Sequence, residues 1–135
     1  MTACNSRTSL DNSSISTDSA TIASGAASFS RNCSGCHGIR RDGIGPKLGG
    51  ITNEVSADWI QRFIKNPQQV ISSGDERAAE LINRYKVVMP SFTALPDDEV
   101  NALVAFLHTH KKSKWKTTVD SVTWISDPVP EKIEV

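Results

Sequence analysis

The stretch from Asn32 to Gly38 reads N-C-S-G-C-H-G and holds two cysteines three positions apart, with a histidine directly after the second. The spacing Cys-x-x-Cys-His serves covalent attachment of a c-type haem. Two thiols add to the two vinyl groups, and the next residue presents its imidazole to the iron from the same turn of chain. Cys33, Cys36 and His37 are therefore candidate residues for binding a haem c and its iron. Such a haem would form part of the core of the fold.

Two other chemistries use closely spaced cysteines. Zinc needs four ligands, and the further candidates are only His108, His110 and the remote Cys4, with no second cysteine pair or spaced histidine pair. A thiol–disulfide exchange pair lies between a strand and a helix, whereas here a helical pattern precedes the motif and a glycine-rich segment follows it. Both alternatives stay open at this point, and haem attachment is favoured.

The segments around the motif are mostly helical in pattern. Ile22, Ala26 and Phe29 share one face of a helix that leads into the cysteine pair. After Pro96, three acidic residues precede a stripe of apolar side chains, which indicates the best-defined helix of the chain. Two stretches between these combine apolar periodicity with a capping residue. Helices are thus expected over about residues 21–32, 56–67, 73–85 and 96–110, which predicts a small all-α domain.

Two segments are expected to be ordered loops. Residues 38–50 contain five glycines and one proline, which disfavours regular structure and lets the backbone pass close to a bulky group. The stretch V-V-M-P-S-F-T-A, from Val87 to Ala94, has no helical period and contains Pro90.

The second loop offers a ligand for the other face of a haem iron. Met89 is the leading candidate, because the only other methionine is Met1. Pro90 fixes the backbone beside it and removes a competing amide donor. His108, His110 and an open iron site are the alternatives. Filling a core is the commoner use of a methionine, so ligation by Met89 depends on the presence of a haem.

Length and charge limit the further possibilities. The 135 residues suffice for one domain. Fifteen basic and fifteen acidic residues leave no net charge, which gives no reason to expect nucleic acid or an anionic membrane as a partner. No run approaches the ~20 apolar residues of a membrane-spanning helix. We expect a flexible tether over residues 1–20, one domain over 21–112 and a C-terminal extension over 113–135.

The motifs occur in a recognisable order between Ile22 and Lys111. They are G-A-A-S-F-S-R-N-C-S-G-C-H-G, G-I-G-P-K-L, S-A-D-W-I-Q-R-F-I-K-N-P, V-M-P-S-F and L-P-D-D-E-V-N-A-L-V-A-F-L. In this order they resemble a class I cytochrome c, which binds a single haem. The resemblance implies an all-α fold of about four helices wrapped around one covalently bound haem c.

The resemblance also implies roles for individual residues of the haem site. The carbonyl of Pro46 resembles the acceptor of the other ring N–H of His37, a bond that fixes the histidine tautomer and tunes the iron. Leu48 would pack on the haem face. Trp59 resembles a tryptophan that donates to a haem propionate, although its helical spacing also permits a purely structural role. Met89 would be the second iron ligand.

Outside the haem site, the resemblance predicts one helix crossing, and the chain differs from the family pattern at two places. Gly25 and Phe29 resemble the small and aromatic residues at which the first helix crosses the last, near Phe106. The family has no counterpart for residues 114–135, and Pro96 stands where a capping serine is usual.

The predicted function is electron transfer. The stretch from F-I-K-N-P to V-M-P-S-F is similar to bacterial respiratory monohaem cytochromes c. This implies passage of single electrons from a quinol-oxidising complex to a haem-copper oxidase or another reductase. Two alternatives remain: a fixed haem subunit of a larger respiratory complex, and a haem enzyme or sensor whose sixth ligand exchanges.

The two ends of the chain carry further expectations. Haem attachment of this type occurs outside the bacterial cytoplasm, so we expect a periplasmic or extracytoplasmic location and an export leader that has been removed. T-A-C-N resembles the end of a lipoprotein signal, which predicts a lipidated Cys4 on a polar tether, with an unpaired spare cysteine as the alternative. The lysines after His110 form a docking patch for acidic partners or solubilise a helix end. Trp115 and Trp124 predict that the extension packs on its own domain or on a partner.

Overall fold

A computed structural model of the chain describes residues 12–111. All regular structure in this range is helical, which confirms the all-α class. The elements are α1 (Ser19–Asn32), a short 3-10 helix η1 (Ile51–Asn53), α2 (Ala57–Lys65), α3 (Pro67–Ser72), α4 (Glu76–Tyr85) and α5 (Asp97–His108). The four helices expected from the sequence correspond to α1, α2, α4 and α5.

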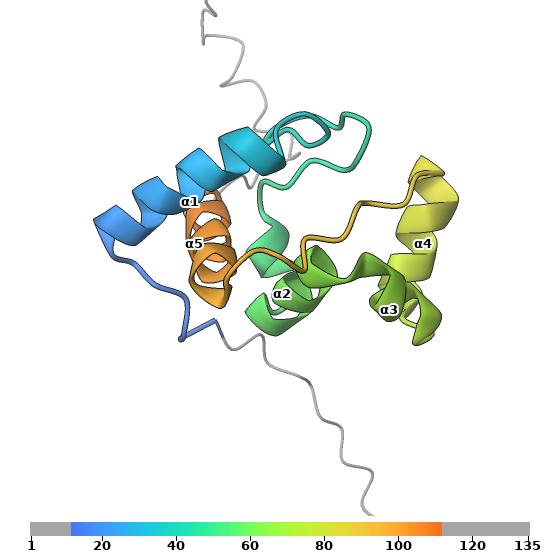
Figure 1. The fold of residues 1–135 in the computed structure, drawn as a ribbon. Coiled ribbons are helices and arrows are strands. Elements are labelled where there is room, and N and C mark those ends of the chain that lie inside the picture. The colour runs from blue at the N-terminus through green and yellow to red at the C-terminus, as the bar shows by residue number, and fades with distance from the viewer. Residues whose placement is uncertain (1–11, 112–135) are drawn as a thin grey trace, which may run out of the picture.

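The crossing of α1 over α5 forms one half of the molecule (Figure 1). A Cβ atom at Gly25 would lie 1.9 Å from the carbonyl oxygen of Ala102, so only glycine permits this approach. One turn further along α1, the rings of Phe29 and Phe106 lie 5.3 Å apart in a tilted pair. The crossing expected from the resemblance is therefore present. The buried faces of α2 and α5, with Leu103 at the centre, continue the core from this crossing.

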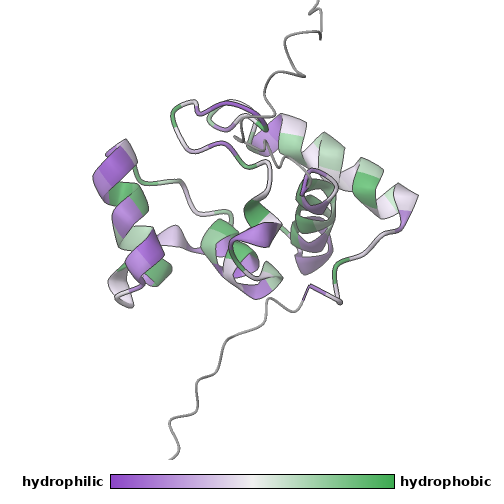
Figure 2. Cartoon of the chain, turned by 180° about the vertical axis from the view of Figure 1, so that it is seen from behind, coloured by the Kyte–Doolittle hydropathy of each residue, from purple (hydrophilic) through white to green (hydrophobic). Residues whose placement is uncertain are grey.

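The other half contains α3 and α4. Here α4 stands apart from α1 and α5, and the segment that connects α4 to α5 runs across the molecule (Figure 1). Hydrophilic and hydrophobic residues alternate along α4 (Figure 2). Ala78 is the buried residue of this helix, so much of its apolar side is not covered by other helices.

Helix starts differ from the sequence expectation at several places, for identifiable reasons. Asp18 caps α1 through the Thr21 N–H, so this helix begins two residues early. The helix expected to end near Pro67 does so, since α2 ends at Lys65. Pro67 also occupies the first position of α3, which was not expected, and its fixed φ and missing N–H are tolerated there. Asn66 caps this helix through the Gln69 N–H. The last helix begins at Asp97, and Pro96 is its cap residue without a side-chain hydrogen bond.

The folded part also begins earlier than residue 21. Asn12 donates from its side-chain amide to the carbonyl of Thr52, and Ile15 packs against the core. Among residues 12–111, no helix is both long and apolar enough to cross a membrane. Residues 1–11 of the expected tether, which include Cys4, and the extension over 113–135 lie outside the described residues.

Candidate functional site

The cysteine pair and the histidine lie in a tight turn at the end of α1. Cys33 is the C-cap residue of this helix, and its N–H donates to the carbonyl of Phe29. The Cys33 carbonyl then accepts the N–H groups of Cys36, at 3.1 Å, and His37, at 2.9 Å. Because one carbonyl binds both amides, the three side chains of the motif come from a single turn of chain, as haem attachment requires.

The environment of the thiols differs from that of a disulfide-exchange pair. Burial, assisted by the neighbouring Cys36, raises the pKa of the Cys33 thiol to about 11. An exchange pair needs a lowered thiol pKa, which a helix N-terminus helps to provide. Cys33 stands instead at a helix C-terminus, so the structure disfavours disulfide exchange. Within residues 12–111, no three His, Cys, Asp or Glu side chains are grouped as metal ligands.

The loop after the motif folds back and holds the imidazole. The carbonyl of Cys36 accepts the Gly45 N–H at 2.9 Å. Next to it, Nδ1 of His37 lies 2.7 Å from the carbonyl oxygen of Pro46, which is the bond implied by the resemblance. With Nδ1–H as the donor, Nε2 is left free to bind a metal. A Cβ at Gly45 would lie 2.6 Å from Cε1 of His37, so glycine is needed for the loop to pass along the ring.

Met89 reaches the same region from the segment between α4 and α5. This segment starts at Lys86, which ends α4 with φ of 60°. It is fixed further on by the Phe92 N–H, which donates to the Ile64 carbonyl at 3.1 Å. Met89 is half-buried and packs against the core, so its thioether is placed by ordered backbone on both sides.

All seven residues proposed from the sequence line one pocket. They are Cys33, Cys36, His37, Pro46, Leu48, Trp59 and Met89. The remaining lining is mostly apolar and comes from α1, α2, α4, α5 and both loops. Leu81, Ile82 and Tyr85 supply the apolar side of α4 to this pocket and are only half-buried.

This pocket fits a haem by the chemistry of its lining. Apolar side chains surround one imidazole and one thioether, the two side-chain types that ligate iron in cytochromes c. Two thiols stand beside the imidazole, where a c-type haem is attached. The apolar face of α4 is only half-buried, and a large apolar group bound in the pocket would cover it. When bound, the haem supplies an iron that cycles between Fe(III) and Fe(II).

Trp59 has a different polar partner from the one that the resemblance implies. Its indole N–H donates to Oδ2 of Asp75 at 2.9 Å, and its ring stacks on Phe63 with centroids 4.8 Å apart. Although burial acts to raise it, hydrogen bonds from the Ala78 N–H and from Trp59 hold the pKa of Asp75 below its ordinary value. The propionate role of Trp59 stays a prediction, and in this structure its N–H ties α2 to the start of α4.

The two histidines weighed as alternative iron ligands lie outside the pocket lining. Nδ1 of His108 lies 2.9 Å from the hydroxyl of Thr52. His110 packs edge-on against Phe106, and its carbonyl accepts the Gly50 N–H. Both therefore join the end of α5 to neighbouring segments, and Met89 is the candidate ligand that the fold brings to His37.

A family model, described as cytochrome c, matches residues 22–111. The chain belongs to the cytochrome c family. It is a class I, monohaem member with one covalently attached haem c, and the family transfers electrons through that haem.

Solved structures agree with this assignment. The cytochrome c domain of the pp3183 protein from Pseudomonas putida is 34% identical, with 64% of this chain and 87% of that chain covered and a TM-score of 0.57. A cytochrome c from Rhodothermus marinus is 24% identical, with 70% of this chain and 79% of that chain covered and a TM-score of 0.64. An engineered form of that cytochrome, bound to a carbene intermediate, is 23% identical, with 70% and 80% covered and a TM-score of 0.63. A search of the curated proteins gave no match.

Two residues of the site were missed from the sequence. Gly45 was one of several glycines in its loop, and G-I-G-P-K-L alone does not show which of them faces His37. The expected helix over about residues 73–85 places Asp75 only near its start, whereas Asp75 caps α4 through the Ala78 N–H. The apolar stripe that follows Asp75 is the sequence signal for such a cap, but nothing in the sequence links Asp75 to Trp59.

Proposed function

We propose that this cytochrome transfers single electrons in a bacterial respiratory chain, from a quinol-oxidising complex towards a haem-copper oxidase or another terminal reductase. The observation that carries the proposal is the presence of both His37 and Met89 in the lining of one apolar pocket. A haem iron held by both His37 and Met89 would leave no free position for a substrate or gas, which favours electron transfer over ligand chemistry. His/Met ligation raises the reduction potential, as suits a late step in respiration.

The rim of the pocket supports exchange with a protein partner. Ile44 and Val87, which line the pocket, are 56% and 51% exposed, and Val88 is 43% exposed. Exposed apolar side chains that gather at one rim support a contact surface there. Lys47 lines the same pocket. The pKa of Asp42 is lowered by hydrogen bonds from the Lys47 N–H and from Tyr85, and then by the nearby charge of Arg84. An apolar rim with basic neighbours favours an acidic partner surface.

The proposed place of action is the periplasmic or extracytoplasmic face of a bacterial membrane. Haem attachment through Cys-x-x-Cys-His supports it, because this attachment occurs outside the bacterial cytoplasm. A lipid anchor on Cys4 would keep the carrier at that membrane. Intact mass measured on the native protein tests the anchor, and an unmodified Cys4 behind a longer N-terminus would contradict it.

Stopped-flow kinetics test the function itself. We expect the oxidised holoprotein to be reduced by a quinol-oxidising complex and the reduced form to be oxidised by a haem-copper oxidase, at rates that fall with ionic strength. Lys47→Glu should slow one of these reactions by about tenfold at low ionic strength. Lys65→Glu makes the same charge change outside the pocket lining and should have little effect. Rapid CO binding to the reduced protein, with no electron exchange with either complex, would overturn the proposal.

A further inference from the structure

A hydrogen bond at the rim of the haem pocket connects two segments that are far apart in the sequence. The hydroxyl of Tyr85, the last residue of α4, donates to Oδ2 of Asp42 at 3.1 Å. Asp42 belongs to the loop that follows the Cys-x-x-Cys-His motif, and in Figure 1 this loop extends towards the C-terminal end of α4. In the described part of the chain, no other hydrogen bond joins residues 38–50 to residues 85–95. The bond therefore ties the loop after the motif to the segment that leads to Met89.

The segment that carries Met89 is held mainly at its two ends. Among the described residues, no backbone hydrogen bond involves residues 87–91. The end towards α5 is fixed by the Phe92 N–H, which donates to the Ile64 carbonyl at 3.1 Å. Between the two ends, Met89 is placed by packing against the core. Its position on the pocket therefore depends on how firmly the end towards α4 is held.

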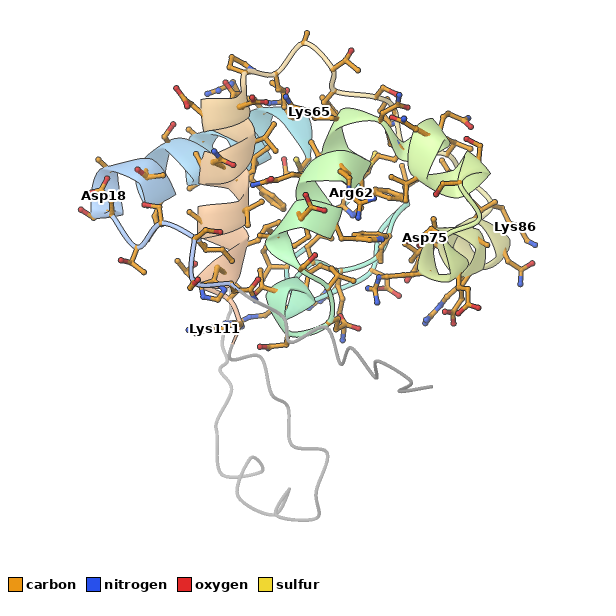
Figure 3. The ribbon with its side chains drawn as sticks, turned by 90° about the horizontal axis from the view of Figure 1, so that it is seen from below. Asp18, Arg62, Lys65, Asp75, Lys86 and Lys111 are labelled. Atoms are coloured by element: carbon orange, nitrogen blue, oxygen red, sulfur yellow. The ribbon has the colours of Figure 1, made fainter. Side chains whose placement is uncertain are left out.

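That end contains a bend at Lys86. This residue has φ of 60°, a left-handed backbone that residues other than glycine seldom adopt and that neighbouring contacts must hold in place. Figure 3 shows Lys86 on the α4 side of the molecule, and its Nζ lies 3.3 Å from Oδ1 of Asn83. Tyr85 directly precedes the bend, so its bond to Asp42 fixes the point from which the Met89 segment leaves α4.

The bond joins a neutral phenol to a carboxylate. Hydrogen bonds from the Lys47 N–H and then from Tyr85 lower the pKa of Asp42 below its ordinary value. Burial, and then the bond to Asp42, raise the pKa of Tyr85. A hydrogen bond to an ionised acceptor is stronger than one between neutral groups. Further contacts hold both partners: Oδ1 of Asp42 accepts the Lys47 N–H at 2.9 Å, and the guanidinium carbon of Arg84 lies 5.5 Å from the centre of the Tyr85 ring.

We propose that Tyr85 and Asp42 are positioning residues that keep Met89 on the haem iron. Without their bond, the end of α4 is released from the loop after the motif, and the segment over residues 87–91 keeps only its attachment at Phe92. The thioether then leaves the iron more often, and another ligand can take its place. The Tyr85–Asp42 bond thereby protects the oxidised carrier against ligand exchange, because a thioether binds Fe(III) more weakly than Fe(II).

The test is the displacement of Met89 by imidazole in the oxidised holoprotein, followed by stopped-flow absorbance of the sulfur-to-iron band. As the imidazole concentration rises, the observed rate should approach a limit, because Met89 must leave before imidazole binds. Tyr85→Phe keeps the ring and loses the hydroxyl, and it should raise this limit about fivefold, the factor that corresponds to one hydrogen bond. Asp42→Asn keeps an oxygen for the Lys47 N–H and should raise the limit in the same direction. The double variant should be no faster than Tyr85→Phe alone, because both changes remove one bond.

A matched control separates this role from a general effect on stability. Gln61 donates to Oδ1 of Asn101 at 2.6 Å, an exposed side-chain hydrogen bond that joins α2 to α5, and both residues lie outside the lining of the haem pocket. Gln61→Ala removes a bond of the same kind and should leave the limiting rate unchanged. Limiting rates in Tyr85→Phe and Asp42→Asn that equal the wild-type rate would overturn the inference, as would an equal rise in Gln61→Ala.

The inference rests on ligation by Met89, as the proposed function does, and the same spectra distinguish the two. A wild-type protein without the sulfur-to-iron band would refute that ligation and both proposals with it. A band in wild type and in all the variants, with equal limiting rates, would refute the role of Tyr85 and Asp42 alone.

Discussion

Replacement of Gly25 by alanine tests the helix crossing on which the pocket is built. In the present geometry the new Cβ would lie 1.9 Å from the oxygen and 2.5 Å from the carbon of the Ala102 carbonyl, and 2.9 Å from Cβ of Phe106. The obstruction is backbone, which cannot turn aside as a long side chain can. To restore ordinary contact, α1 and α5 would have to separate by about 1.5 Å, and a gap of ~1 Å already forfeits up to half of a dispersion contact.

The expected size of the effect follows from three contributions. Overpacking costs about 1–3 kcal/mol, and a backbone clash places it at the upper end. Loss of the Phe29–Phe106 pair costs about 1 kcal/mol more, whereas alanine in place of glycine inside a helix returns about 1 kcal/mol. We expect Gly25→Ala to lower the free energy of unfolding of the holoprotein by about 2–3 kcal/mol. In a domain of this size that lowers Tm by roughly 10–20 °C.

Urea unfolding followed by far-UV circular dichroism measures this change. Gly35→Ala is the matched control, because a Cβ there meets nothing within 4 Å and its φ is not positive. The control should change the free energy of unfolding by less than about 1 kcal/mol. Equal stability of Gly25→Ala and wild type would refute the close crossing of α1 and α5.

Two further predictions concern the histidines. Gly45→Ala should push the ring of His37 away from Pro46 and weaken the Nδ1 hydrogen bond. This change lowers the free energy of unfolding by about 1 kcal/mol and raises the reduction potential, because the imidazole becomes a weaker donor; an unchanged potential would contradict it. Burial, and then the charge of Lys111, lowers the pKa of His108 from its ordinary 6.5. The unfolded chain is then protonated first, so stability should fall as the pH drops below about 6.5. His108→Gln should flatten this slope in urea titrations between pH 8 and 5, and an equal slope in both proteins would refute the assignment.

The long helices were predictable because their signals are local. Apolar residues recur with a helical period, and Ser56 caps α2 through the Trp59 N–H as its position indicates. The presence of α3 was not expected, for a physical reason. A proline ends one helix and begins another equally well, and only the Asn66 side chain, as a cap, distinguishes the two.

The site was predictable where residue type alone limits the chemistry. Cys33, Cys36 and His37 form a motif, and Met89 was the only methionine besides Met1. Contacts between distant segments were not predictable in the same way. The bond from Trp59 to Asp75 depends on how α2 meets α4, which no local pattern encodes.

Visible absorption spectroscopy of the purified holoprotein tests the central claim, a covalent haem c held by His37 and Met89. We predict a pyridine haemochrome of the c type, and a weak sulfur-to-iron band in the oxidised protein that disappears in Met89→Leu. The reduced wild-type protein should bind no CO at neutral pH, whereas reduced Met89→Leu should bind it. A wild-type spectrum without the sulfur band, or a band that survives in Met89→Leu, would contradict the account.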